Sequence, residues 1–342
     1  MYVLDIDTVK EQLTMSMAIN AIEALLKVQS DHPKWVKTPE RLVIPTFEES
    51  NNHANGSHLS MPSVVFDGEN EYTVVKLVSI CPDNPKRGKP TTMATITVSD
   101  NATGEILAFL DGIYITQVRT AALSGIATKY LAKQDSRVMA VVGTGGMAYE
   151  QLNAILTVRP NIKQVNIWNR TLQVAHKFEN KFRQEYPQWQ VDFKVYENIA
   201  DAIKDADIIN LATRAKTGLF EASQIKPNTH INAVGAYQAT MKEVSNSVIE
   251  ASASVIIDDV KGGLHEAGDL IQAHNDMNCS WTWEQLTGTL SDLVTEKVRI
   301  DTNENKGITL FKSVGAASFD AAVALKIAQK AKEEGLGQLV KL

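Results

Sequence analysis

The sequence contains only two cysteines, Cys81 and Cys279, which are far apart in the chain. Neither belongs to a CxxC pair, and no histidine lies at the spacing of a zinc ligand from either. The paired acids of SVIIDD and the nearby HE dipeptide lack a second pair of ligands at metal spacing. We therefore expect free thiols in a reducing compartment, no metal site, and a structural role for these acids.

Long apolar runs and clusters of basic residues are also absent. No stretch approaches the ~20 apolar residues of a membrane-spanning helix. The first residues, MYVLDIDTVKEQL, carry acids where a secretory signal peptide has basic residues. The net charge is −6, and the lysines and arginines are scattered rather than gathered into a phosphate-binding stripe. We expect a cytoplasmic protein that has neither a membrane nor a nucleic acid as a partner.

The composition is that of a soluble globular protein, with 44% hydrophobic and 22% charged residues. A chain of 342 residues exceeds one typical domain, so two domains are expected. Residues 1–30 predict a short strand and a helix. Residues 41–110 contain short β-branched runs separated by Asn, Gly, Pro and Asp, the pattern of strands joined by turns, with a hairpin at DNATGEIL.

The pattern changes after an Ala-rich helix that we expect from Thr116. Strand-like segments then alternate with helical ones: RVMAVVG, QVNIWN, VDFKVY, DIINLAT, THINAVG and SVIIDD. Such alternation predicts a parallel, doubly wound sheet. We expect an α/β fold in which a Rossmann dinucleotide-binding domain (119–305) is inserted into a smaller α+β domain. That smaller domain is formed by residues 1–118 and by residues 306–342, which contain a last strand and a last helix.

A glycine motif of the form GxGxxA joins the first of these strands to a helix. Gly143 would make the tight turn, Gly145 would let the backbone approach a pyrophosphate, and Ala148 would allow close helix packing. The alternative is a plain strand-to-helix turn, but the motif lies at the first βα turn of an alternating domain. We therefore expect a dinucleotide to contact Gly143, Thr144, Gly145, Gly146 and Met147.

The end of the second strand indicates which dinucleotide is used. An NAD site usually has an acid there for the ribose 2′-hydroxyl, whereas this chain has Asn169, Arg170 and Thr171. A guanidinium and a hydroxyl would bind a 2′-phosphate that a carboxylate would repel. The same residues could instead cap the next helix. We expect NADP(H) to be favoured over NAD(H).

A series of segments between residues 38 and 330 resembles the ornithine cyclodeaminase/μ-crystallin family. In order, they are PERLVIP, YTVVKLV, DNATGEILAFLDG, TQVRTAALSGIATKYLA, VVGTGGMA, IWNRT, NAVGA, VIIDD, HEAGDL and FKSVGAASFDAAVA. The RTAA and FKSVG segments in combination are more specific than the glycine motif. The resemblance implies a Rossmann domain inserted into a substrate-binding and dimerisation domain, and hence a homodimer. Few helices are predicted to cover the strands of residues 41–110, and this also favours the association of two copies of the chain through the uncovered sheet.

The resemblance also implies roles for individual residues. Arg41, Lys76 and Arg119 match positions that surround the substrate carboxylate in the family. Cations of this kind suit an amino or imino acid, because arginine can hold a carboxylate in a bidentate pair. Each could alternatively be a solvated surface charge, although Lys76 lies within an apolar strand, where an unpaired ammonium is costly. The expected dinucleotide contacts also include Thr91, Ala212, Thr213, Val234 and Ser313.

The chain departs from the family pattern at Tyr237. Members that cyclise ornithine have an aspartate there, whereas a phenol is a poor base at neutral pH that can still donate a proton. The tyrosine resembles the reductase branch, the Δ1-pyrroline-2-carboxylate and ketimine reductases. We expect reduction of a small imino acid, with Lys76 or Tyr237 as the catalytic proton donor. Amino-acid dehydrogenation, ornithine cyclodeamination to proline, and non-enzymatic binding of small molecules remain alternatives.

Overall fold

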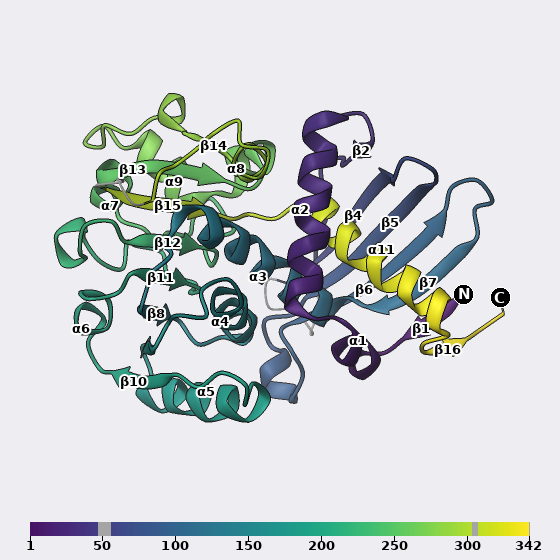
Figure 1. Cartoon of the computed structure of the whole chain (residues 1–342), viewed down its shortest axis with the longest axis horizontal. Coiled ribbons are helices and arrows are strands. Elements are labelled where there is room, and N and C mark those ends of the chain that lie inside the picture. Colours follow the sequence, from purple (N-terminus) through teal and green to yellow (C-terminus); the bar gives the residue numbers. More distant parts are fainter. Residues whose placement is uncertain (47–55, 303–306, 342) are drawn as a thin grey trace. The chain divides into compact units, whose positions relative to one another are not determined.

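The computed structural model describes residues 1–46, 56–302 and 307–341, which form two compact units. Unit 1 comprises Met1–Arg119 and Ala316–Leu342, and unit 2 comprises Thr120–Gly315. Both units contain a β-sheet and helices (Figure 1). The α/β fold class expected from the sequence is confirmed. Among the helices of the described residues, none is long and apolar enough to cross a membrane.

The sheet of unit 1 is almost entirely antiparallel, with the strand order β16-β1-β7-β6-β5-β4-β2 and with β3 also paired to β4. Among the described strands of this sheet, only β1 and β7 are parallel neighbours. The expected hairpin joins β6 to β7, where Gly104 has a positive φ of 77°. The strands are β1 (Tyr2–Leu4), β2 (Val36–Lys37), β3 (Leu42–Pro45), β4 (Ser57–Phe66), β5 (Glu71–Ile80), β6 (Thr92–Asp100), β7 (Ile106–Asp111) and β16 (Gln338–Leu339).

Helices α2 and α11 lie together over one face of this sheet, as Figure 1 shows in purple and yellow. Side chains alternate between the faces of a strand, and in β5 the buried set is Val74, Lys76 and Val78, whereas Leu77 is 53% exposed. Lys76 therefore lies on the covered face. The helices are α1 (Ile6–Gln12), α2 (Met15–Asp31), the start of α3 (Gly112–Leu131), α11 (Ala317–Glu334) and a 3-10 turn, η1 (Asn84–Arg87).

The sheet of unit 2 is wholly parallel, in the order β10-β9-β8-β11-β12-β15-β13-β14. The chain runs outward from β8 through β9 and β10, then returns to β11 on the other side of β8. This reversal is a topological switch point, where open α/β sheets bind ligands at the carboxyl ends of the strands. The strands are β8 (Val138–Val142), β9 (Gln164–Trp168), β10 (Asp192–Tyr196), β11 (Ile208–Leu211), β12 (His230–Ala233), β13 (Ser252–Ile257), β14 (Gly288–Thr289) and β15 (Ile308–Lys312).

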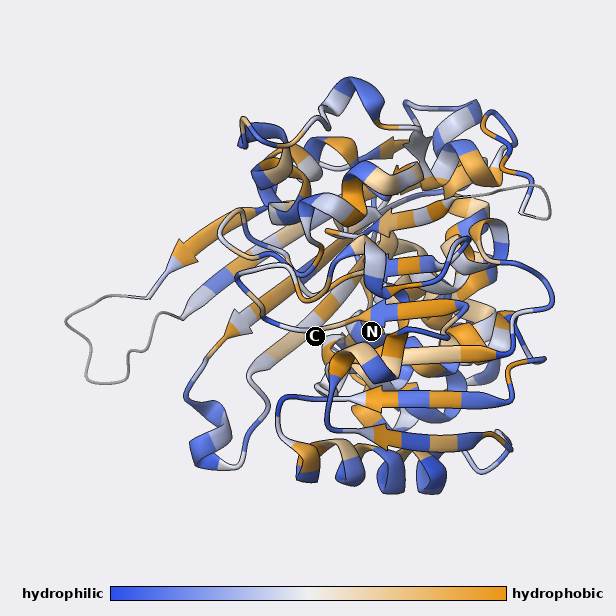
Figure 2. Ribbon diagram, turned by 90° about the vertical axis from the view of Figure 1, so that its left-hand side faces the viewer, coloured by the Kyte–Doolittle hydropathy of each residue, from blue (hydrophilic) through white to orange (hydrophobic). Residues whose placement is uncertain are grey.

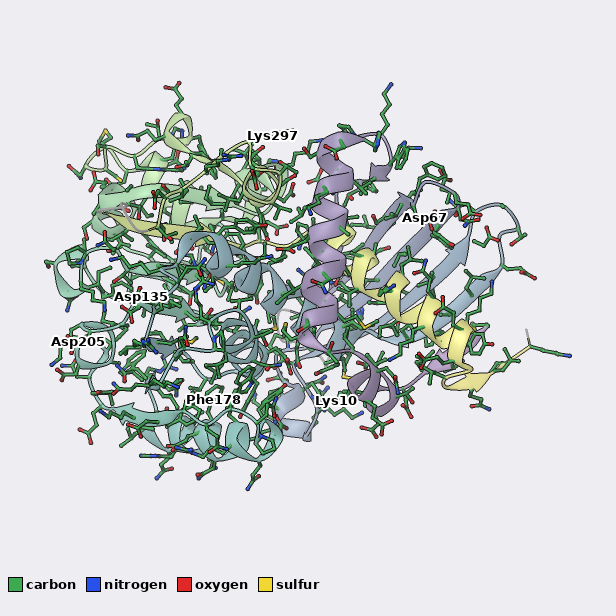
Figure 3. All side chains as sticks on the ribbon, in the orientation of Figure 1. Lys10, Asp67, Asp135, Phe178, Asp205 and Lys297 are labelled. Atoms are coloured by element: carbon green, nitrogen blue, oxygen red, sulfur yellow. The ribbon has the colours of Figure 1, made fainter. Side chains whose placement is uncertain are left out.

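Separate apolar clusters cover the two faces of the parallel sheet. Helix α5 shows how they form, because Ala175, Phe178 and Phe182 are buried while the rest of the helix is mostly hydrophilic (Figure 2; Phe178 is labelled in Figure 3). The helices are α4 (Gly146–Val158), α5 (Leu172–Glu185), α6 (Ile199–Ile203), α7 (Asn246–Ala251), α8 (Val260–Glu266), α9 (Gly268–Asn275), α10 (Leu290–Val294), η2 (Ala222–Gln224) and η3 (Trp283–Gln285).

The assignment of the last strand to the first domain was wrong. We expected residues 306–342 to belong there, but β15 pairs in parallel with both β12 and β13 inside the sheet of unit 2. The chain enters unit 1 again only at Ala316. Burial explains the position, because every residue of β15 is buried, as expected of a central strand of a parallel sheet. The expected boundary at 305/306 itself lies outside the described residues.

Candidate functional site

A buried carboxylate joins two of the cations predicted to bind substrate. In unit 1, Nζ of Lys76 donates to Oδ2 of Asp320 at 2.6 Å, and Nε of Arg119 donates to Oδ1 of the same aspartate at 2.9 Å. Lys76 comes from β5, Arg119 from α3 and Asp320 from the first turn of α11. The side chains of Lys76 and Asp320 are 2% and 1% exposed. The structure therefore brings Lys76 and Arg119 together, and neither is a solvated surface charge.

This cluster carries more positive than negative charge. Burial lowers the pKa of Lys76 to about 8; the charge of Asp320 opposes this shift, while the charges of Arg119 and Arg41 add to it. Burial alone would raise the pKa of Asp320, but Arg119 and Lys76 hold it below its usual value. One carboxylate between two cations leaves an excess of one positive charge. Because uncompensated buried charge is costly, the cluster favours an additional anion such as a substrate carboxylate.

Asp320 was missed by the sequence reasoning. It lies among apolar residues in FDAAVALKIA, on the buried side of α11. An acid in the apolar stripe of a helix was the available signal, because a buried carboxylate requires a partner. The sequence alone does not identify the partners of Asp320, because Lys76 and Arg119 lie 244 and 201 positions away from it.

The other two predicted positions of unit 1 are half-buried. Arg41 immediately precedes β3, and its positive charge contributes to lowering the pKa of Lys76. Thr91 immediately precedes β6, and its carbonyl accepts a hydrogen bond from the amide of Cys81. A carboxylate contact for Arg41 and a dinucleotide contact for Thr91 stay predictions.

The glycine turn of unit 2 has the features of a phosphate cradle. Gly143 has a φ of +90°, which favours glycine, and its amide donates to the carbonyl of Trp168 at the end of β9. Gly145 is the N-cap of α4 without a side-chain cap, and a Cβ added there would meet no atom within 4 Å. The buried hydroxyl of Thr144 has no hydrogen-bond partner among the described residues. Open space, amides at the start of α4, including those of Gly146 and Met147, and an unsatisfied hydroxyl fit a dinucleotide pyrophosphate.

The segments that follow β11 and β12 adjoin this turn. A Cβ on Gly143 would lie 2.7 Å from the carbonyl oxygen of Ala212 and from Cγ2 of Thr213, so the backbones are in close contact. The amide of Val234 donates to the carbonyl of Leu211, which extends the pairing of β11 and β12. The predicted positions 143, 212, 213 and 234 thus cluster at the carboxyl ends of adjacent strands.

Ser313 follows the neighbouring strand β15 and is buried. Its hydroxyl donates to Oδ2 of Asp258 at 2.7 Å, and the same carboxylate accepts from the amides of Val314 and Gly315. Asp258 therefore has the structural role that we expected for it. The predicted contact between Ser313 and a dinucleotide stays a prediction.

The residues expected to read the ribose follow β9. Asn169 donates from Nδ2 to the carbonyl of Thr171, and Arg170 is exposed. Thr171 is the N-cap of α5, as the capping alternative required, but its side chain makes no cap hydrogen bond. The end of the strand therefore presents an amide, a guanidinium and a hydroxyl, with no carboxylate among these three residues.

Tyr237 follows β12 and is half-buried in unit 2. The preceding residue, Ala236, is fixed through its amide by Glu243 and through its carbonyl by Lys312. The backbone immediately before Tyr237 is thus fixed by hydrogen bonds on both sides of Ala236, near the predicted dinucleotide contacts. Within the ranges that the structure describes, no three His, Cys, Asp or Glu side chains are grouped as metal ligands.

Comparisons with known proteins agree with this arrangement. The model of the "Ornithine cyclodeaminase/mu-crystallin family" matches residues 1–335. A Δ1-pyrroline-2-carboxylate reductase of Bacillus cereus is 34% identical over 93% of both chains. The Thermococcus litoralis Δ1-pyrroline-2-carboxylate reductase, solved with NADH and L-proline, is 32% identical, with a TM-score of 0.88 over 99% of this chain and 100% of that one. An archaeal alanine dehydrogenase dimer with bound NAD is 26% identical, with a TM-score of 0.86 over 100% of this chain and 99% of that one. The family resemblance is therefore confirmed: this chain belongs to the ornithine cyclodeaminase/mu-crystallin family.

Proposed function

We propose that this protein is an NAD(P)H-dependent reductase of a small imino acid, such as the cyclic ketimine Δ1-pyrroline-2-carboxylate. The observation that carries this function is the buried excess of positive charge at Lys76, Arg119 and Asp320. It suits a substrate with a single carboxylate. The related reductases from Bacillus cereus and Thermococcus litoralis, the latter holding NADH and L-proline, support the same reaction class.

The residues of unit 1 would bind the carboxylate and supply a proton. Arg119 uses Nε for Asp320, which leaves its terminal nitrogens for a bidentate pair with the substrate. Lys76, with a pKa of about 8, is largely protonated at neutral pH and can give a proton to an imine nitrogen, which makes the imine carbon more electrophilic. Arg41 would add positive charge near the carboxylate. A bound reduced nicotinamide supplies the hydride.

The residues of unit 2 would hold the dinucleotide. The turn at Gly143 and Gly145 binds the pyrophosphate, and the segment Asn169–Thr171 reads the ribose. We propose a preference for NADP(H), because Arg170 can pair with a 2′-phosphate and no acid stands at the end of β9 to repel it.

Two other activities of the family are less well supported. Amino-acid dehydrogenation is the same chemistry in reverse with ammonia released, and the similar archaeal alanine dehydrogenase makes it the second candidate. Ornithine cyclodeamination needs a base for the substrate amine, and Tyr237 is a poor one at neutral pH. A purely binding role would leave the buried lysine without use as a proton donor.

We also propose a homodimer located in the cytoplasm. The open sheet face of unit 1, defined by Leu77, Met93 and Phe109, presents large exposed apolar side chains on three neighbouring strands. Such patches mark interfaces, and the similar alanine dehydrogenase is described as a dimer. Both cysteines are free thiols, in keeping with a reducing compartment.

The absorbance of the reduced nicotinamide tests the reaction. We expect NAD(P)H consumption with Δ1-pyrroline-2-carboxylate or Δ1-piperideine-2-carboxylate, slower consumption with pyruvate plus ammonia, and little or no proline from ornithine with NAD(P)+. Tight dinucleotide binding with no turnover of any imino acid would favour a binding protein. Proline formation at a rate comparable with imine reduction would show that another acid replaces the missing aspartate.

A further inference from the structure

Glu243 places a fully buried carboxylate between the ends of two strands of unit 2. Its Oε1 accepts a hydrogen bond from the amide of Thr213 at 2.5 Å, beyond the end of β11. Its Oε2 accepts from the amides of Gly235 at 2.6 Å and Ala236 at 3.0 Å, beyond the end of β12. One side chain therefore satisfies three backbone donors from two separate segments, and charge-assisted bonds of this kind are strong.

These segments are in direct contact with the glycine turn. A Cβ on Gly235 would lie 2.1 Å from the carbonyl oxygen of Thr213, and a Cβ on Gly143 would lie 2.7 Å from the carbonyl oxygen of Ala212. The backbones at the ends of β8, β11 and β12 are thus in direct contact, with no room for a side chain at Gly143 or Gly235. Tyr237 extends from the last of these segments, so a displacement around Glu243 is transmitted to both the turn and the phenol.

The backbone amide of Glu243 contacts a buried ion pair that is formed by Asp269 and Lys312. Asp269 of α9 accepts from the amides of Glu243 and Val244 through Oδ1 and from Nζ of Lys312 through Oδ2. Lys312 of β15 also donates to the carbonyl of Ala236 at 2.6 Å. Burial raises the pKa of Glu243 to about 7; the positive charge of Lys312 opposes this shift and the negative charge of Asp269 adds to it.

We propose that Glu243 is a positioning residue whose ionised carboxylate holds the dinucleotide turn and the Tyr237 segment in their binding arrangement. This role rests on the proposed dinucleotide site. Protonation of Glu243 weakens its ability to accept from three amides, so dinucleotide affinity should fall as the pH drops below the pKa. A residue that merely filled the core would produce no such pH dependence.

The dissociation constant of NADH tests this role, because NADH lacks the 2′-phosphate, whose own ionisation lies near pH 6. It is measured between pH 5.5 and 8.5 from the fluorescence of the bound reduced nicotinamide. We expect wild-type binding to weaken about five- to tenfold from pH 8 to pH 5.5, since a pKa change of about one unit on binding corresponds to tenfold. Glu243→Gln, which loses the charge and one acceptor, should bind about tenfold more weakly at pH 8 with a flat pH profile.

The matched control is Glu185→Gln at the exposed end of α5, which should retain the wild-type profile. Equal affinity and an equal profile in Glu243→Gln and wild type would overturn the role of Glu243. Failure of the wild type to bind any dinucleotide would instead overturn the proposed function. If circular dichroism shows that Glu243→Gln is unfolded, Asp269→Asn serves in its place, because removing the charge that raises the pKa of Glu243 should move the pH midpoint downward. If that variant also fails to fold, a flat wild-type profile would overturn the role and a sloping one would support it.

Discussion

Asp320 accepts one hydrogen bond from Lys76 and another from Arg119, so a single carboxylate fixes both cations on the covered face of the unit 1 sheet. Asp320 also raises the pKa of Lys76 against the effect of burial. Replacing Asp320 by asparagine removes this charge, so the pKa of Lys76 should fall further below about 8.

Asp320→Asn should therefore move the alkaline limb of the pH profile for imine reduction to lower pH by about one unit or more. At pH 8 the value of kcat/KM should fall roughly 10- to 100-fold, with partial recovery at lower pH. Initial rates between pH 6 and 9.5 provide the measurement. Glu333→Gln at the exposed end of α11 is the control. An alkaline limb unchanged by Asp320→Asn would mean that Lys76 is not the group whose ionisation limits the rate.

Lys76 and Tyr237 can be separated as proton donors by single substitutions. Lys76 has a lowered pKa of about 8 and an ordered partner, so Lys76→Ala should reduce kcat for imine reduction by roughly 100-fold or more. Tyr237→Phe keeps the ring and should reduce kcat less than tenfold. Steady-state kinetics of both variants, with folding checked by circular dichroism, decide between them. A loss of 10- to 100-fold confined to Tyr237→Phe would assign the proton to the phenol instead.

Arg170→Ala tests the preference for NADP(H). The exposed guanidinium can contact a 2′-phosphate but has no such group to contact in NADH. The variant should bind NADPH roughly ten- to hundredfold more weakly and NADH about as well as the wild type, because a charge-assisted contact is worth a few kcal/mol at most. Fluorescence titrations with both dinucleotides give the answer. Equal losses for the two would place Arg170 away from the 2′ position.

The homodimer can be tested on the open sheet face of unit 1. Light scattering at micromolar concentration should give about twice the 37.6 kDa of one chain. Leu77→Glu places a charge on this face and should shift the protein toward the mass of one chain, whereas Val174→Glu on the exposed side of α5 should not. A wild-type mass of one chain would refute the homodimer.

Much of the fold could be predicted because regular patterns repeat along the chain. The strands from Val138 to Ile257 alternate with helices, and Lys76 stood out as an ammonium in an apolar strand. The position of β15 could not be predicted in this way. The alternation breaks down between β13 and β15, where β14 has only two residues and short helical turns intervene. Periodicity identifies a strand, but it does not identify the sheet that the strand joins.

The site was predicted less completely than the fold. The glycine turn has a local motif, and residues 143–147 could be found from it alone. Asp320 and Glu243 have no such motif, because their partners lie at distant positions or are backbone amides. Glu243 lies in an irregular segment between β12 and α7. A buried acid of this kind is evident only once the fold shows that water cannot reach it.

The central position of β15 also determines the order in which unit 2 can be completed during synthesis on the ribosome. Strand β13 pairs with β15 on one side and with β14 on the other, so β15 separates it from β12 in the sheet. Until Lys312 has emerged, the nascent chain can assemble β8 to β12, but it lacks β15, the strand that connects β12 to β13 and β14 in the finished sheet. The growing protein therefore carries an unpaired edge at β12 late into translation, where a chaperone or a competing strand could bind it.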